Sequence, residues 1–320
     1  PLPQPLRRAI LGTSTSTSIV AWPLRRVRVG LVAHERGCHC GADPSCFTVP
    51  HPGKPTTMRA PLLAAFAAIA ASEPASPMHD EIEDFRSAAA SKRMDRVLDH
   101  QYSPMYGTFI MPMAKRRGKR PVKLFEIGIG CHGGSSTHAR AWGGNTELWP
   151  QLLPDAEIWM ADLMQACAQS AMRRNGRIRT VFGDQGDPAV LRRWVVEANA
   201  LPPSGQPFDV IIDDGGHKNQ QIKLTFDHLW PVLAPGGLYF MEDLQVGRKR
   251  AFSDHSTESF KYPPIAELME AWTEQLILAN TFKWSEQMPK WKEHPEVYVL
   301  PANVSFVHCQ REACVIGKSL

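Results

Sequence analysis

Short apolar runs alternate with stretches of helical periodicity between residues 122 and 242, and this alternation constrains the fold more than any other feature of the chain. The run Val210-Ile211-Ile212 is continuous rather than alternating in polarity, as is typical of parallel strands covered on both faces. The sequence therefore predicts an open, doubly wound α/β domain with a mostly parallel sheet. The predicted strands are residues 122–127, 157–162, 177–182, 208–213 and 238–242, and the predicted helices between them are residues 163–174, 188–200 and 220–233.

The C-terminal residues depart from this simple repeat. A helical pattern at residues 265–279 is followed by an apolar stretch at 297–300 and by strand patterns at 304–308 and 313–317, which a tight polar turn separates. Two strands joined so closely pair as an antiparallel hairpin. We therefore expect a sheet of seven strands that this hairpin closes.

An N-terminal helical segment, residues 78–119, precedes the predicted main domain of residues 120–320. Residues 80–100 have apolar side chains at mostly helical spacing, with acidic residues first and basic residues later. This order of charges suits the helix dipole, and the spacing predicts an amphipathic helix.

The residues before this segment have the composition of a leader. Residues 1–57 hold eight prolines and a Thr-Ser run without sustained apolar periodicity, which predicts disorder. After Met58, residues 60–71 are all apolar, which matches the hydrophobic part of a signal peptide and is too short to span a membrane. We expect Met58 to be the biological start, residues 1–57 to be a disordered leader or a gene-model extension, and residues 58–77 to be a signal peptide and spacer. The protein would then enter the secretory pathway or be secreted, whereas an organelle transit peptide or a disordered tail on a cytoplasmic protein stays open.

The excess of positive charge lies in this leader. Residues 1–57 carry seven basic and two acidic side chains, whereas residues 58–320 carry 29 basic and 30 acidic ones. A nucleic-acid partner is therefore not expected. No apolar run reaches the length of a membrane span, and seven cysteines are too few for a disulfide scaffold.

A glycine-rich turn follows the first predicted strand. Gly128 and Gly130 come directly after residues 122–127, and glycines at the carboxyl end of a strand let the backbone approach a ligand closely. Together with Gly133 they complete the spacing G-x-G-x-x-G, so a dinucleotide-binding oxidoreductase is one interpretation. An ordinary glycine-rich turn is another.

The second and third predicted strands end at polar residues that suit a nucleoside. Asp162 ends the second strand, and its carboxylate can accept hydrogen bonds from both hydroxyls of a ribose, a role compatible with capping the next helix. Asp184 and Gln185 follow the third strand, and an acid beside an amide suits the edge of an adenine.

Acidic residues end the fourth and fifth strands, as Asp213-Asp214 and Glu242-Asp243. If these strands are neighbours, about 4.8 Å apart, their acidic ends meet at one crevice. Carboxylates so close together repel unless a cation lies between them, and oxygen ligands indicate Mg²⁺ or a similar divalent ion. His217 follows Asp214 across two glycines and can turn back over this site as a general base. The alternative is two acidic strand ends that cap helices beside a surface histidine.

Several motifs together carry a resemblance to a known family. They are Leu124-Phe-Glu-Ile-Gly-Ile-Gly130, Gly183-Asp-Gln185, Phe208-Asp-Val-Ile-Ile-Asp-Asp-Gly-Gly-His217 and Pro235-Gly-Gly-Leu-Tyr-Phe-Met-Glu-Asp243, with Tyr102-Ser-Pro104 upstream. From about residue 95 to the end, the chain resembles the class I S-adenosylmethionine-dependent methyltransferases. Within them it is most similar to the Mg²⁺-dependent macrolide sugar O-methyltransferases of the mycinamicin and tylosin type. The acidic motifs are specific, whereas the glycine loop is generic.

The resemblance implies a role for each candidate residue. Asp214, Glu242 and Asp243 would hold the metal ion, and His217 would be the catalytic base. The implied cofactor contacts are Glu126, Gly128 and Gly130 to the methionine part, Asp162 to the ribose, Asp184 and Gln185 to the adenine, Tyr102 over the cofactor, and Asp213. Two departures from the family are Gly216, where serine is usual, and the His- and Gly-rich loop at residues 131–145.

The implied reaction is transfer of the methyl group of S-adenosylmethionine to a hydroxyl of a small molecule or sugar. A homo-oligomer stays open. The rival interpretations are the oxidoreductase, which leaves the acidic strand ends unexplained, and a non-catalytic S-adenosylmethionine-binding module, against which the intact His217 argues.

Overall fold

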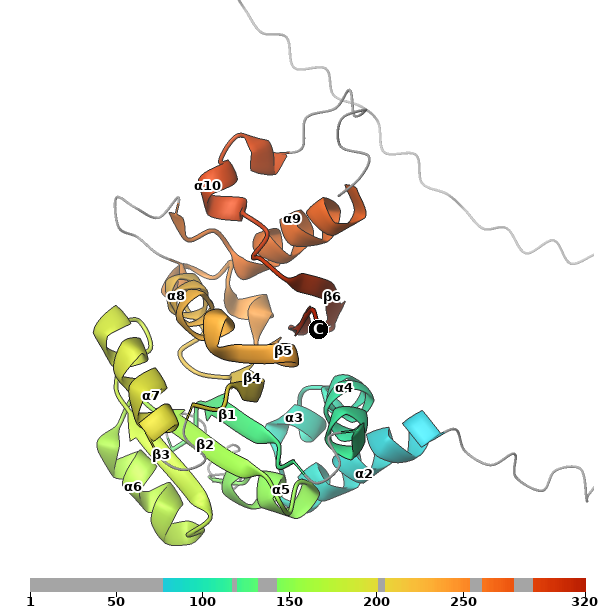
Figure 1. Cartoon of the computed structure of the whole chain (residues 1–320), viewed down its shortest axis with the longest axis vertical. Coiled ribbons are helices and arrows are strands. Elements are labelled where there is room, and N and C mark those ends of the chain that lie inside the picture. The colour runs from blue at the N-terminus through green and yellow to red at the C-terminus, as the bar shows by residue number, and fades with distance from the viewer. Residues whose placement is uncertain (1–76, 117–119, 132–142, 201–204, 254–260, 279–289) are drawn as a thin grey trace, which may run out of the picture. The chain divides into compact units, whose positions relative to one another are not determined.

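The computed structural model describes residues 77–116, 120–131, 143–200, 205–253, 261–278 and 290–320 (Figure 1). The expected leader and most of the expected signal peptide and spacer, residues 1–76, lie outside these residues, as does Gly133. All the described residues belong to one unit that spans Ala68–Leu320. Among them no helix is both long enough and apolar enough to span a bilayer.

Seven strands form one sheet in the order β3-β2-β1-β4-β5-β7-β6 (Figure 1). Strands β1 to β5 run parallel, and β7 pairs antiparallel with both β5 and β6. The predicted doubly wound sheet with a C-terminal antiparallel hairpin is therefore confirmed. The strands are β1 (Lys123–Ile127), β2 (Glu157–Asp162), β3 (Ile178–Phe182), β4 (Phe208–Asp213), β5 (Leu233–Met241), β6 (Val304–Gln310) and β7 (Ala313–Lys318).

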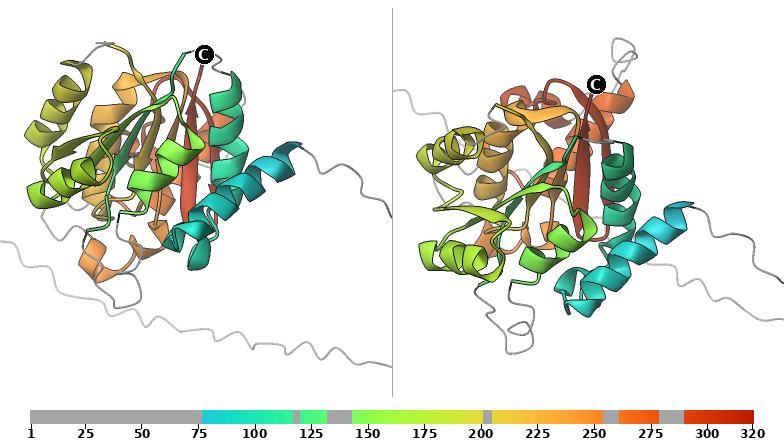
Figure 2. Two further views of the ribbon diagram at one scale, coloured as in Figure 1. Left: turned by 90° about the horizontal axis from the view of Figure 1, so that it is seen from below. Right: turned by 60° about the horizontal axis from the view of Figure 1, so that its bottom comes forward.

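Two layers of helices cover the sheet (Figure 2). Alternate residues of each strand point to opposite faces, so the strands contribute to two hydrophobic cores. One core lies between the sheet and α2, α4, α5 and α6, and the other lies between the sheet and α7, α8 and α9. The helices are α2 (Pro77–Ser91), α3 (Asp95–Leu98), α4 (Ser103–Arg116), α5 (Asn145–Leu152), α6 (Gln165–Arg174), α7 (Pro188–Ala200), α8 (Asn219–Leu229), α9 (Ile265–Leu278) and α10 (Pro295–Tyr298).

The N-terminal helical segment differs from its prediction. The single helix expected over residues 80–100 is two helices, because Arg93 adopts a left-handed φ of 58° between α2 and α3. The sequence pattern also did not predict α4 as a separate helix. Phe85 and Tyr106, on α2 and α4, have no exposed surface and pack in the same core as the sheet.

The order of the strands sets the position of the site. β1 lies between β2 and β4, so the chain crosses to opposite sides of β1 at this point, where open α/β sheets bind ligands. In the register, Ile127 of β1 pairs with Asp213 of β4, and Asp213 pairs with Met241 of β5. Asp214 and Glu242 are therefore the first residues beyond two neighbouring strand ends.

Candidate active site

A cavity of about 680 Å³ opens at the carboxyl ends of β1 to β5. Four of the twelve predicted site residues do not line it and are buried instead, namely Tyr102, Glu126, Asp213 and Glu242. The other eight line the cavity and are Gly128, Gly130, Asp162, Asp184, Gln185, Asp214, His217 and Asp243.

The end of β1 requires a glycine. Gly128 has a φ of +96°, and a Cβ atom there would overlap the backbone carbonyl of Asp214. Its N–H donates to the carbonyl of Ala161 at 2.9 Å. The loop therefore crosses from β2 to the end of β4 with its backbone against both, and Gly128 and Gly130 form part of the cavity wall.

Asp162 joins this loop to the helix after β2. One carboxylate oxygen accepts from the N–H of Ile129 at 3.2 Å, and the other accepts from the N–H of Met164 at 2.9 Å. Each oxygen keeps a second lone pair, and the side chain borders the cavity. Asp162 thus joins the glycine loop to the N-cap residue of α6 and can still accept hydrogen bonds from a ligand.

Gln185, in the cavity wall, forms a buried pair with Asp213, which does not line the cavity. The Gln185 amide donates to Asp213 at 2.9 Å, and its oxygen accepts from the N–H of Gly216 at 2.8 Å. Burial raises the pKa of Asp213 to about 6, against the opposing effect of the Gln185 hydrogen bond. Asp213 is therefore a support for Gln185 and not a group on the cavity surface. Both ends of the Gln185 amide are bonded within the protein. One oxygen of Asp184 is bonded too, since it accepts from the N–H of Gly186 at 2.7 Å and from the Gln221 amide at 3.0 Å.

Asp214, His217 and Asp243 converge beside this cavity. Each offers one ligand atom, and these atoms lie within 4.8 Å of one another. The imidazole Nε2 of His217 lies 3.6 Å from Asp243 and 4.0 Å from Asp214. His217 and Asp243 have left-handed φ values of 56° and 57°, a strained conformation that is common at functional sites. The two carboxylates offer oxygen ligands of the kind that Mg²⁺ binds, and the imidazole lies beside them.

Glu242 does not join this group, in contrast to the predicted set of three acidic ligands. Its carboxylate accepts a hydrogen bond from the hydroxyl of Tyr106 and lies 3.0 Å from Nε of Arg96. Both residues lie beyond β5, which ends at Met241, and the left-handed backbone of Asp243 turns its side chain away from that of Glu242. Among the described residues, the side chain that lies beside Asp214 and Asp243 is that of His217, the predicted base.

Arg96, on α3, is a site residue that the motifs did not reveal. Its guanidinium is 1% exposed and lies 2.5 Å from Glu126, 2.8 Å from Asp214 and 3.0 Å from Glu242. Burial disfavours its charge, but these carboxylates outweigh burial and raise the pKa of Arg96 above its ordinary value. Glu126, predicted to contact the cofactor, is instead held here, with Trp149 donating to its other oxygen at 2.7 Å. An arginine inside an apolar helical pattern was the available sequence signal.

Tyr102 lies behind the cavity and orients Asp243. Its hydroxyl donates to the Asp243 carboxylate at 2.8 Å, and its ring stacks on His100 with centroids 5.1 Å apart. His100 borders the cavity and bonds to Glu312 at 2.6 Å. Tyr102 is buried and does not line the cavity, whereas His100 does, and a contact of Tyr102 with the cofactor stays a prediction.

Comparison with known proteins finds relatives that are named as O-methyltransferases. No family model matches the chain. The chain is 31% identical over 145 residues to mycinamicin VI 2''-O-methyltransferase of Micromonospora griseorubida, which is 45% of this chain and 32% of that protein. It is 33% identical over 153 residues to 8-demethyl-8-alpha-L-rhamnosyl tetracenomycin-C 2'-O-methyltransferase of Streptomyces olivaceus, which is 48% of this chain and 35% of that protein. The matched region thus spans about a third of the length of these relatives.

A solved structure shares the fold. The MycE methyltransferase of mycinamycin biosynthesis, in complex with Mg, SAH and mycinamycin VI, superposes with a TM-score of 0.54 at 23% sequence identity. The match covers 74% of this chain and 53% of that one. The chain therefore has the fold of this methyltransferase.

Proposed function

We propose that this chain belongs to an S-adenosylmethionine-dependent, Mg²⁺-dependent O-methyltransferase that acts on a hydroxyl of a small molecule or sugar. The observation that carries the proposal is the convergence of Asp214, His217 and Asp243 at the edge of the cavity that the glycine loop lines. The matched relatives are named as O-methyltransferases of mycinamicin VI, of demethylmacrocin and of a rhamnosyl tetracenomycin-C, and the rhamnosyl group in the last name supports a glycosylated acceptor.

The cavity has the features that this cofactor requires. Gly128 and Gly130 bring backbone to its wall, Asp162 offers a carboxylate for the ribose, and Asp184 offers one for the adenine edge. These groups follow β1, β2 and β3, so a nucleoside would lie across the strand ends. Its sulfonium end would then reach toward the group of Asp214, His217 and Asp243.

Different residues of the site would bind the metal ion, orient its ligands and take up the proton during methyl transfer. A bound Mg²⁺ supplies positive charge that lowers the pKa of an acceptor hydroxyl, and Asp214 and Asp243 would hold it. Tyr102 fixes Asp243, and Arg96 fixes Asp214. His217 would take the proton of the acceptor hydroxyl, and S-adenosylmethionine, when bound, would supply the methyl group to the acceptor oxygen. The products are a methyl ether, S-adenosylhomocysteine and a proton on His217.

The direct test is calorimetric binding of S-adenosylmethionine with and without Mg²⁺, followed by incubation of labelled cofactor with a cell extract. We expect binding, and labelled products that require Mg²⁺. A change in absorbance at 340 nm with a nicotinamide cofactor would instead support an oxidoreductase. Binding without any transfer would support a non-catalytic module.

Asp162→Ala should weaken binding of S-adenosylmethionine by about tenfold or more, because hydrogen bonds to a charged acceptor contribute roughly 1.5 to 3 kcal/mol. Isothermal titration calorimetry measures the change. Asp155→Ala, at an exposed site outside the cavity, is the matched control. Unchanged affinity for S-adenosylmethionine in Asp162→Ala would show that Asp162 has only a structural role, through its bonds to Ile129 and Met164.

Asp214→Asn should raise the dissociation constant for Mg²⁺ by about tenfold, since one charged ligand becomes neutral. Activity should return in part at high Mg²⁺. Binding of Mn²⁺, followed by electron paramagnetic resonance, measures the affinity without any acceptor. Asp227→Asn, exposed on α8, carries the same substitution away from the cavity and should leave the affinity unchanged. Equal Mn²⁺ affinity in Asp214→Asn and the parent protein would remove Asp214 from the metal site.

Localisation in the secretory pathway is part of the same proposal. The expected signal peptide carries it, and two disulfides, Cys131–Cys167 and Cys309–Cys314, support it, since disulfides persist mainly in oxidising compartments. N-terminal sequencing of the native protein tests it, because processing after the apolar run would leave a new N-terminus near residue 71.

A further inference from the structure

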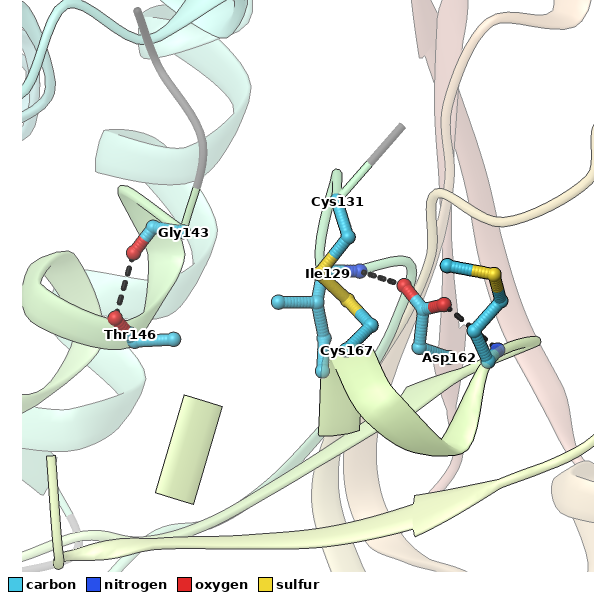
Figure 3. Close-up of a disulfide and its surroundings, with 7 residues drawn as sticks. Ile129, Cys131, Gly143, Thr146, Asp162 and Cys167 are labelled. Atoms are coloured by element: carbon cyan, nitrogen blue, oxygen red, sulfur yellow. Dashed lines mark hydrogen bonds between the residues drawn. A yellow bond between two sulfur atoms is a disulfide. The ribbon is translucent and has the colours of Figure 1, made fainter. Parts of the chain in front are cut away.

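The Cys131–Cys167 disulfide lies in the wall of the proposed cofactor site (Figure 3). Cys131 directly follows Gly130 in the glycine loop and lines the cavity. Cys167 is buried in the first turn of α6, and the two Cα atoms are 5.8 Å apart. The bond thus ties the end of the glycine loop to the helix that follows the proposed ribose-binding residue.

We propose that this disulfide holds the glycine loop in its cofactor-binding conformation, so that cofactor affinity depends on the redox state of Cys131 and Cys167. This inference rests on the proposed function, because it takes the cavity to bind S-adenosylmethionine and S-adenosylhomocysteine. Cys131 and Cys167 are in this view positioning residues, which act through the loop and not on the transferred methyl group.

The glycine loop has little else to restrain its backbone at Gly130, next to Cys131. Gly128 is held by its contact with Asp214 and its bond to Ala161. Gly130, by contrast, has a φ of +76°, and a Cβ atom built there would have no neighbour within 4 Å. Glycine has the largest conformational freedom of any residue, and ordering a free loop on binding lowers affinity. A covalent bond at the next residue removes that cost before the ligand arrives.

The disulfide also supports Asp162. Figure 3 shows Asp162 beside the two sulfur atoms, with a hydrogen bond to the loop at Ile129. Its other oxygen accepts from Met164, three residues before Cys167. The loop, Asp162, the start of α6 and the disulfide therefore form a closed ring of contacts. Opening the ring at the disulfide frees the loop and the acid that it bonds.

The chemistry of the switch is a two-electron exchange. A dithiol reductant breaks the S–S bond, two thiols form at Cys131 and Cys167, and the reductant becomes a disulfide. A chemical oxidant or an oxidising compartment reverses the change. Because binding and oxidation favour one conformation, bound cofactor should shift the equilibrium for reduction of the disulfide by the same factor by which oxidation favours binding.

The chain contains its own control. Cys309 and Cys314 face each other in the register of β6 and β7 and form the second disulfide. Neither lines the cofactor cavity. Reduction breaks both bonds, so a Cys309→Ser/Cys314→Ser variant and a Cys131→Ser/Cys167→Ser variant separate their effects.

The experiment is calorimetric binding of S-adenosylhomocysteine to the full chain in the presence of EDTA, which keeps metal ions from the thiols. Peptide mass mapping first establishes the pairing. We expect reduction to weaken binding by about fivefold or more, in line with the loss of a preorganised loop. The Cys131→Ser/Cys167→Ser variant should bind weakly with or without reductant. The Cys309→Ser/Cys314→Ser variant should keep both the parent affinity and its loss on reduction.

Several results would overturn the proposal. Equal affinity of the oxidised and reduced chains would do so, as would free thiols at Cys131 and Cys167 in the oxidised protein. Loss of cofactor affinity in Cys309→Ser/Cys314→Ser alone would show that the redox dependence comes from the Cys309–Cys314 disulfide. Circular dichroism at the titration temperature shows that each form is folded. If the oxidised chain binds no S-adenosylhomocysteine at all, the proposed function itself fails, which is a distinct outcome.

Discussion

Replacement of His217 with alanine should lower kcat by about a hundredfold or more at neutral pH, as expected for loss of a general base. His217 Nε2 lies 3.6 Å from Asp243, so the imidazole is placed at the same edge of the cavity as the proposed metal ligands. Both carboxylates of Asp214 and Asp243 remain in the variant, and affinity for Mn²⁺ should therefore stay close to that of the parent.

Raising the pH should recover part of this loss, because hydroxide can replace the missing base. Initial rates from pH 6 to pH 10 measure the recovery, and His79→Ala, at an exposed site on α2, is the matched control. Full activity of His217→Ala together with loss of activity on chelation would show that the base assignment is wrong. Loss of Mn²⁺ binding in His217→Ala would instead make His217 a ligand. Unchanged methyl transfer in the presence of chelator would make the acidic group structural.

Replacement of Arg96 with methionine should lower the free energy of unfolding by about 3 to 5 kcal/mol, the usual effect of removing one partner from a buried ion cluster. Arg96 is surrounded by Glu126, Asp214 and Glu242. Without the guanidinium, these carboxylates are left in the protein interior with no matching positive charge. Urea denaturation of the two proteins measures the difference.

The size of this loss should depend on pH. Burial already raises the pKa values of Glu126 and Glu242, and Arg96 opposes this effect. Removing Arg96 raises these pKa values further in the folded state, so the folded variant takes up protons that the unfolded chain releases. The difference in stability between parent and variant should accordingly shrink as the pH falls from 8 toward 5.

Two further variants define the cause of the Arg96 effect. Arg96→Lys keeps the charge, but an ammonium cannot span three carboxylates as a guanidinium does. Its free energy of unfolding should therefore lie between those of the parent and of Arg96→Met. Arg86→Met, at a half-exposed ion pair on α2, should change the stability by less than about 1 kcal/mol. An equal loss of unfolding free energy in Arg86→Met and Arg96→Met would show that the buried cluster around Arg96 stabilises the fold no more than a surface ion pair does.

Local patterns predicted most of the sheet. β2, β4 and α7 have the predicted bounds; both strands end at an aspartate, and α7 begins at a proline, a favoured first residue of a helix. The meeting of acidic residues at two neighbouring strand ends also followed from sequence, since the parallel arrangement places carboxyl ends together.

Other features depend on contacts between distant residues. The direction of Glu242 depends on its contacts with Tyr106 of α4 and Arg96 of α3, which a run of carboxylates does not reveal. Arg96 lies 146 residues from Glu242 in the chain, and its partners become known only when α3 is placed on the sheet. The pairing of Cys131 with Cys167 likewise depends on the crossing from β1 to β2.

The position of Arg96 on α3 sets a lower limit on the size of an active fragment. A protein trimmed to the seven strands and their connecting helices, starting at residue 120, would contain all the acidic strand ends and lack the cation that neutralises them. It would also lack Tyr102 and Tyr106, which bond to Asp243 and Glu242. Any gene shortened in evolution or in the laboratory must therefore retain the chain from before α3, even though the sheet itself begins more than twenty residues later.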